Sequence, residues 1–256
     1  MTGDLLAYVE SGSGPTIVFI HGMTFTGHTW DPIVARLSDR FRCITVDLPG
    51  HGESQGSGAD PRAVGARIHA TLTAADEQDP VVVVGHSAGA LIATGYATLY
   101  PTAGVVNVDQ TTLVAPFAGF VQQLGPALRG PDFISAFAPF RDSIGVDRLP
   151  EPERTRVAAT QHIEQSLVLD YWTGPLTTPP AVLQQEIDAL LDAVRVPYLW
   201  LAGEAIPRRD RELMLAHIPT AQIEEWPGSG HMVHLAEPDR FAERVAQFVD
   251  GVTADA

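Results

Sequence analysis

Short apolar runs alternate with helical patterns along most of this chain, and no other feature limits its possible folds so strongly. Near-continuous runs rich in β-branched residues are typical of strands buried on both faces of a parallel sheet. The expected strands are Thr16–Ile20, Cys43–Val46, Val81–Val84, Val105–Val108, Tyr198–Leu201 and Gln222–Trp226. The expected helices are Ala63–Ala75, Ala88–Tyr100, Val182–Val194, Arg209–His217 and Arg240–Val249. This order predicts an α/β protein with a doubly wound, mostly parallel sheet.

Two Asp-Pro pairs indicate where helices begin. Asp31-Pro32 and Asp60-Pro61 each place a potential capping side chain before a proline. Because proline is favoured at the first helical position and aspartate at the preceding cap, we expect Asp31 and Asp60 to cap helices.

One long segment interrupts the alternation. From Thr111 to about Pro180 the sequence is rich in proline and aromatic residues and contains no convincing strand. In a doubly wound sheet, the chemistry lies at the carboxyl ends of the strands. We therefore expect a helical lid of residues 111–180, inserted into a core formed by residues 1–110 and 181–256.

Length and charge exclude several classes of protein. The chain has 256 residues, 16 basic and 31 acidic side chains, and a formal net charge of −15. Such an acidic surface disfavours nucleic acid and anionic membranes as partners, because both require clustered positive charge. Cys43 is the only cysteine, so no intrachain disulfide can form. With no signal-like or membrane-spanning stretch, we expect a cytoplasmic protein.

The strongest chemical signal is the sequence Gly85-His86-Ser87-Ala88-Gly89. The pattern G-x-S-x-G is weak alone, but here it follows a buried-strand run and opens a helix, as a nucleophile elbow requires. The turn is sharp, so the positions two residues either side of the serine must be small. This context favours Ser87 as a nucleophile over a serine that only caps the helix.

A serine nucleophile needs a base and donors for the developing oxyanion. His231 follows the last expected strand in Gly228-Ser229-Gly230-His231 and is the favoured base, whereas His234 is expected to be structural. The expected donors are the backbone amides of Ala88 and Met23. Gly22 allows a close approach, and His21 is expected to tie this loop down by hydrogen bonds rather than to act as a second base.

These motifs together resemble the α/β-hydrolase fold over nearly the whole chain. The matching pieces, in order, are His21-Gly22, Asp47-Leu48-Pro49-Gly50-His51-Gly52-Glu53-Ser54, the elbow, and Gly230-His231. The resemblance implies that Asp47 and His51 are structural, because the second stretch is a conformational loop in this family.

The triad acid departs from the commonest family pattern. That pattern has an aspartate in the loop after the penultimate strand, where this chain offers only Glu204. Some members instead carry the acid one strand earlier, and lactone-opening members such as zearalenone lactonase have a glutamate there. Asp109, which ends the run Val105–Val108, fits this variant. Asp109 is favoured to orient His231, and Glu204 is the alternative.

The resulting hypothesis is a serine hydrolase that cleaves a small, mostly hydrophobic carboxylic ester or lactone through an acyl-enzyme. No phosphate-binding loop or metal-ligand cluster is evident, so no cofactor or metal is expected. The alternatives are a cofactor-free oxygenase or lyase that uses the His-Asp pair, a perhydrolase, and a ligand-binding receptor with little turnover. The expected lining of the substrate site consists of Gly22, Met23, Phe25, Trp30, Phe117, Phe120, Trp172 and Met232.

Overall fold

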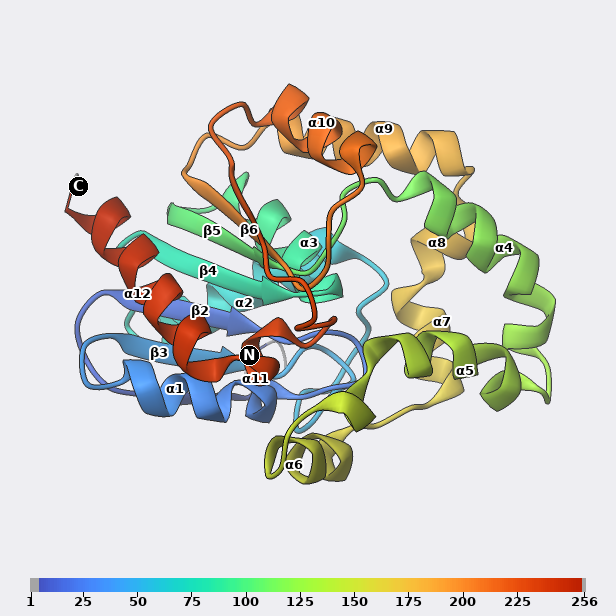
Figure 1. Cartoon of the computed structure of the whole chain (residues 1–256), viewed down its shortest axis with the longest axis horizontal. Coiled ribbons are helices and arrows are strands. Elements are labelled where there is room, and N and C mark those ends of the chain that lie inside the picture. The colour runs from blue at the N-terminus through green and yellow to red at the C-terminus, as the bar shows by residue number, and fades with distance from the viewer. Residues whose placement is uncertain (1–4, 255–256) are drawn as a thin grey trace.

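The fold is built on one twisted, mostly parallel sheet (Figure 1). A computed structural model describes residues 5–254. Within them, seven strands lie in the order β1-β3-β2-β4-β5-β6-β7, with β1 antiparallel to β3 and the other neighbours parallel. The strands are β1 Tyr8–Ser11, β2 Thr16–Ile20, β3 Arg42–Val46, β4 Val81–His86, β5 Thr102–Val108, β6 Tyr198–Ala202 and β7 Gln222–Glu225. The predicted doubly wound sheet is confirmed.

Helices cover both faces of this sheet, and alternate strand residues divide between the two faces. On one face, Val83 and Val105 pack against α2 Pro61–Ala74, α3 Ala88–Ala97, α9 Pro180–Asp192 and α10 Arg208–His217. On the other, Val84 and Val106 pack against α1 Asp31–Leu37 and α12 Pro238–Thr253. Because the side-chain period of a strand is two, each apolar run supplies both cores at once.

Local differences from the sequence prediction have physical reasons. Strand β1 was not predicted, because it is a mostly exposed edge strand with no apolar run. Asp60 caps α2 as expected by accepting a hydrogen bond from the Arg62 amide. The predicted cap at Asp31 is wrong: the short 3₁₀ helix η1 Gly27–Trp30 runs directly into α1, so Trp30 is the cap residue and Asp31 is already helical.

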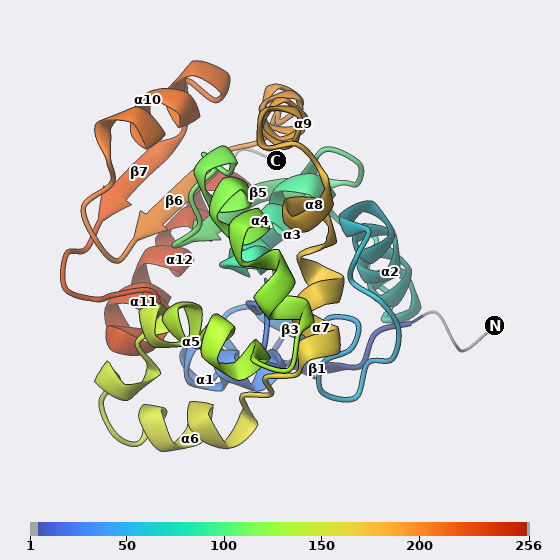
Figure 2. The same cartoon turned by 90° about the vertical axis from the view of Figure 1, so that its right-hand side faces the viewer.

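Residues 111–180 contain helices and no strand. The helices are α4 Ala115–Arg129, α5 Phe133–Ile144, α6 Glu153–Thr160, α7 Gln165–Tyr171 and α8 Thr173–Thr177, with the 3₁₀ turn η2 Val146–Arg148 between α5 and α6. They gather along one edge of the sheet, toward the viewer in Figure 2; in Figure 1, α4, α5, α7 and α8 lie on the right and α6 lies at the bottom. We refer to residues 115–177 as the helical segment. No helix in the described part of the chain, residues 5–254, is long and apolar enough to cross a membrane.

Candidate active site

Ser87 lies in a sharp turn between β4 and α3. Its backbone has φ +52° and ψ −127°, a conformation that costs an L-residue free energy and is concentrated at functional sites. The Ser87 amide donates to the carbonyl of Val108 at 3.0 Å, which ties the turn to the end of β5. A Cβ atom on Gly85 would lie 2.3 Å from the Gly89 carbonyl oxygen, and one on Gly89 would lie 2.5 Å from that of His21. The turn therefore tolerates only glycine at both positions.

His231 and Asp109 form a close pair at the same edge of the sheet. His231 Nδ1 lies 2.7 Å from Asp109 Oδ2, and the two side chains are only 24% and 21% exposed. The second carboxylate oxygen, Oδ1, accepts a hydrogen bond from the Gly203 amide at 2.8 Å. A proton on Nδ1 completes the bond to the carboxylate and leaves Nε2 with a free lone pair. This is the protonation state of a general base.

The competing carboxylate is placed elsewhere. Glu204 is exposed, and it makes no hydrogen bond or ion pair with any residue of the described range 5–254. The structure therefore brings Asp109, and not Glu204, to His231.

A buried asparagine shapes the turn that carries Asp109. Asn107 is fully buried in β5, and its side chain accepts from the amide of Gln110 at 3.0 Å and donates to the carbonyl of Gln110 at 2.8 Å. It also donates to the hydroxyl of Tyr198 at 3.2 Å. These bonds close a turn in which Asp109 has φ +55°, an unusual value for a non-glycine residue. Sequence reasoning missed Asn107, although a single amide in a valine-rich strand was a readable signal.

The loop after β2 lies directly against the nucleophile. A Cβ on Gly22 would lie 3.2 Å from Ser87 Cβ and 2.9 Å from His86 Nδ1, so this close approach requires glycine. Neither the Met23 amide nor the Ala88 amide has a hydrogen-bond acceptor among residues 5–254. Two unpaired donors beside a serine hydroxyl are what a developing oxyanion needs.

Two histidines hold this loop. The Leu48 amide donates to His21 Nε2 at 2.9 Å, so Nδ1 carries the proton and donates to the Gly22 carbonyl at 2.8 Å. The Thr24 amide donates to His51 Nε2 at 3.0 Å. These contacts fix the peptide groups on both sides of Met23. Asp47 supports the same loop by accepting from the Gly27 amide at 2.8 Å.

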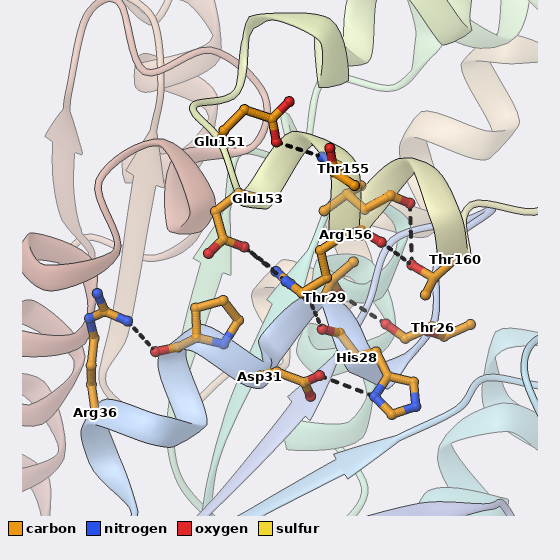
Figure 3. Close-up of polar contacts among 12 residues, drawn as sticks. Thr26, His28, Thr29, Asp31, Arg36, Glu151, Glu153, Thr155, Arg156 and Thr160 are labelled. Atoms are coloured by element: carbon orange, nitrogen blue, oxygen red, sulfur yellow. Dashed lines mark hydrogen bonds and ion pairs between the residues drawn. The ribbon is translucent and has the colours of Figure 1, made fainter.

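The helical segment is bonded to the same loop and to η1. The His162 amide donates to the Thr24 carbonyl at 2.8 Å, and Thr24 has φ +72°. Arg156 on α6 pairs with Glu153 and donates to the main-chain carbonyl of His28, as Figure 3 shows. Further along, Tyr171 donates to the Pro49 carbonyl at 2.9 Å. The helical segment is thus attached to the stretch Asp47–Ser54, through Pro49, and to the loop that carries Met23.

The predicted lining residues fall into different places. Met23 packs against a cluster in the helical segment that includes Phe117 and Trp172. Phe25 and Met232 belong to a second apolar cluster, with Leu149, Val157 and Leu235.

Trp30 and Phe120 belong to neither of these two apolar clusters. Trp30 is completely buried under the sheet, against Phe19, His234 and Phe241. Phe120 is 46% exposed on α4 and contacts Phe140. The sequence indicates that both positions are aromatic but does not fix the face on which each side chain lies.

Four buried histidines have lowered pKa values, chiefly because burial disfavours the cation. Burial lowers the pKa of His51 to about 4 and that of His234 to about 3. For His21 and His86, burial holds the pKa well below its ordinary value. His21 and His51 accept amide hydrogen bonds through Nε2, which requires the neutral ring.

These pKa values predict a loss of stability on acidification. Below about pH 6.5 the unfolded chain protonates these histidines while the folded chain does not, so the free energy of unfolding falls as pH falls. Each histidine contributes a slope of up to about 1.4 kcal/mol per pH unit, or about 5 kcal/mol per pH unit for the four together. Urea unfolding between about pH 7 and pH 5 measures this slope. His234→Leu removes one of these titrating groups, so we expect the slope to decrease by up to about 1.4 kcal/mol per pH unit. An unchanged slope would contradict the prediction.

No group of three or more His, Cys, Asp or Glu side chains within residues 5–254 is arranged to hold a metal ion. The candidate site therefore consists of Ser87, His231, Asp109 and the unpaired amides of Met23 and Ala88.

Known proteins with similar sequences and structures include hydrolases of ester bonds. The sequence profile of the alpha/beta hydrolase family matches residues 17–244. A pimeloyl-[acyl-carrier protein] methyl ester esterase of Xanthomonas oryzae pv. oryzae is 29% identical, over 94% of this chain and 97% of its own length. A thermophilic esterase from Thermogutta terrifontis superposes with a TM-score of 0.72 at 23% identity, covering 96% of this chain and 93% of its own. The enol-lactonase from Burkholderia xenovorans superposes with a TM-score of 0.71 at 20% identity, covering 95% and 96%. At these identities the two superpositions show the shared fold.

Proposed function

Because the chain belongs to the alpha/beta hydrolase family, we propose that it hydrolyses a small, mostly hydrophobic carboxylic ester or lactone through an acyl-enzyme on Ser87. The observation that carries this proposal is the convergence of three parts at one edge of the sheet. They are the strained elbow at Ser87, the loop that packs against it at Gly22, and the pair formed by His231 and Asp109.

The proposed reaction has two steps that share one proton carrier. Ser87 Oγ attacks the carbonyl carbon while His231 Nε2 takes the hydroxyl proton, and the amides of Met23 and Ala88 stabilise the oxyanion. The tetrahedral intermediate then collapses, and the leaving alkoxide takes the proton from His231. Water, deprotonated by His231, attacks the acyl-enzyme, and the acid is released as His231 returns the proton to Ser87 Oγ. With a lactone, the alcohol formed in the first step remains attached to the acyl group.

The substrate class is inferred from the side chains beside the reacting groups. Met23 packs against the apolar cluster that includes Trp172. Met232, which follows His231 in the sequence, belongs to the second apolar cluster, with Phe25. Such surroundings favour an uncharged acyl or alcohol group, since an unpaired charge would lose its hydration there. The esterase and lactonase names of the similar proteins agree with this class.

We also propose that the helical segment is a lid over the site.

A substrate panel with covalent trapping tests the proposal. We expect turnover of aryl esters and lactones with apolar acyl groups. The matched esters with a terminal carboxylate on an acyl chain of the same length should react at least about tenfold more slowly, because of the desolvation cost. The panel includes dimethyl pimelate, in which both carboxyl groups are esterified, because the name of the Xanthomonas relative contains a pimeloyl methyl ester. Treatment with a fluorophosphonate should add one label, on Ser87, and stop all turnover.

The other outcomes point to other functions. Turnover without labelling of Ser87 would favour base catalysis by the His-Asp pair, as in a cofactor-free oxygenase or lyase. Turnover only with peroxide as the acyl acceptor would indicate a perhydrolase. Thermal stabilisation by panel members without turnover would favour a receptor.

A further inference from the structure

The residue that precedes the candidate nucleophile is a buried histidine with no role in the reaction proposed above. His86 is 1% exposed, and its ring lies in contact with two other histidine rings. Ring centroids are 4.7 Å apart for His86 and His231 and 4.8 Å apart for His86 and His234. His86 Nε2 lies 2.9 Å from the main-chain carbonyl oxygen of His231.

This contact fixes the protonation of the His86 ring. A carbonyl oxygen only accepts, so Nε2 carries the proton and donates to His231. Nδ1 is then unprotonated, and it faces Gly22, 2.9 Å from the position that a Cβ would take there. Burial holds the pKa of His86 well below its ordinary value, which keeps the ring neutral beside His231.

His86 therefore contacts each of the three parts of the candidate site. It is bonded covalently to Ser87, it packs against the loop of Gly22 and Met23, and it holds the backbone of His231.

The loop that carries His231 needs such a contact. Gly228 and Gly230 both have positive φ values, +92° and +63°, so the approach to His231 is built from flexible residues. The Gly230 amide donates to the Gly203 carbonyl at a long 3.2 Å. Without the bond from His86, the main-chain carbonyl of His231 would have no partner among residues 5–254.

We propose that His86 is a positioning residue. Through its Nε2–H bond to the His231 carbonyl, it fixes the position of His231 relative to Ser87 and to the loop that carries the Met23 amide. This inference rests on the proposed function for its kinetic consequence, although the structural consequence is independent of it.

The test compares three variants. His86→Leu removes the donor, His86→Gln keeps an N–H donor at a similar reach, and His234→Leu removes an equally buried neighbouring ring whose nitrogens have no hydrogen-bond partner among residues 5–254. We expect His86→Leu to lower kcat by about 100-fold with little change in KM, because misplacement of a base by about 1 Å has this effect. His86→Gln should recover at least about tenfold of the loss, and His234→Leu should stay within about threefold of wild type.

A second measurement does not depend on turnover. The proton on His231 Nδ1 gives a low-field NMR resonance when the ring is aligned with Asp109. We expect this resonance in wild type and in His234→Leu, and its broadening or loss in His86→Leu at a temperature where all three are folded. Equal kinetics and equal spectra for His86→Leu and His234→Leu would overturn the positioning role. Absence of ester turnover in wild type would instead overturn the proposed function and leave the spectral test in force.

Discussion

Replacing Ser87 by alanine is expected to lower kcat for ester hydrolysis by about 10⁶-fold, the size of effect seen when a triad serine is removed. The hydroxyl is the only group that forms the acyl bond in the proposed reaction, and no neighbouring side chain can take its place. Alanine keeps the Cβ that the strained turn already accommodates, so the fold should persist. The measurement is turnover of the best panel ester by the variant, together with its thermal unfolding.

An exposed serine with no part in the proposed reaction provides the matched control. Ser143 donates to the carbonyl of Phe140 on the exposed side of α5. Ser143→Ala should therefore keep full turnover and full labelling by a fluorophosphonate. Substantial turnover in Ser87→Ala would show that the reaction does not pass through this hydroxyl.

The second large effect is expected at Asp109, where a change to asparagine should lower kcat by about 10⁴-fold. The substituted side chain would retain a carbonyl oxygen, and the Gly203 amide, which now donates to Asp109 Oδ1, would select that oxygen. The amide nitrogen of the new side chain would then face His231 Nδ1. A donor in that position stabilises the tautomer with the proton on Nε2, which cannot accept a proton from Ser87. Steady-state kinetics on the same ester measures the loss.

Glu204→Gln is the control for this prediction. Glu204 is exposed and lies just beyond Gly203, so its change should alter kcat by less than about threefold. If instead Glu204→Gln were the more damaging of the two, the assignment of the acid to Asp109 would be wrong.

The sequence was sufficient to predict the sheet, because its strands depend on short local patterns. All six expected strands coincide with observed strands to within a few residues, and Gln222–Trp226 matches β7 apart from its last residue. Asp109 and His231 were paired from their positions at strand ends, and the structure places them 2.7 Å apart. Parallel strands bring their carboxyl ends to one edge, so position along the chain made both Asp109 and Glu204 candidates, and the resemblance to the lactone-opening members of the family favoured Asp109.

Features that depend on the direction of a side chain were harder to predict. The structure places Trp30 under the sheet and Phe120 on the surface, although both were expected in the substrate site. The role of His86 depends on a hydrogen bond to a residue far away in the sequence, and Asn107 adds a bond to the distant Tyr198 to its local bonds with Gln110. No local pattern reports such contacts, although a polar side chain within an apolar run indicates where to look.

The bond between His162 and Thr24 limits how the helical segment can be exchanged in protein engineering. Grafting the helices of a relative onto this core is an obvious way to change substrate preference. A graft that places no backbone amide at the position of His162 would leave the Thr24 carbonyl without its donor and would loosen the loop that presents the Met23 amide. If the helical segment is the lid proposed above, a chimera has to preserve this main-chain bond with its new helices, because the bond couples the helices to the Met23 amide.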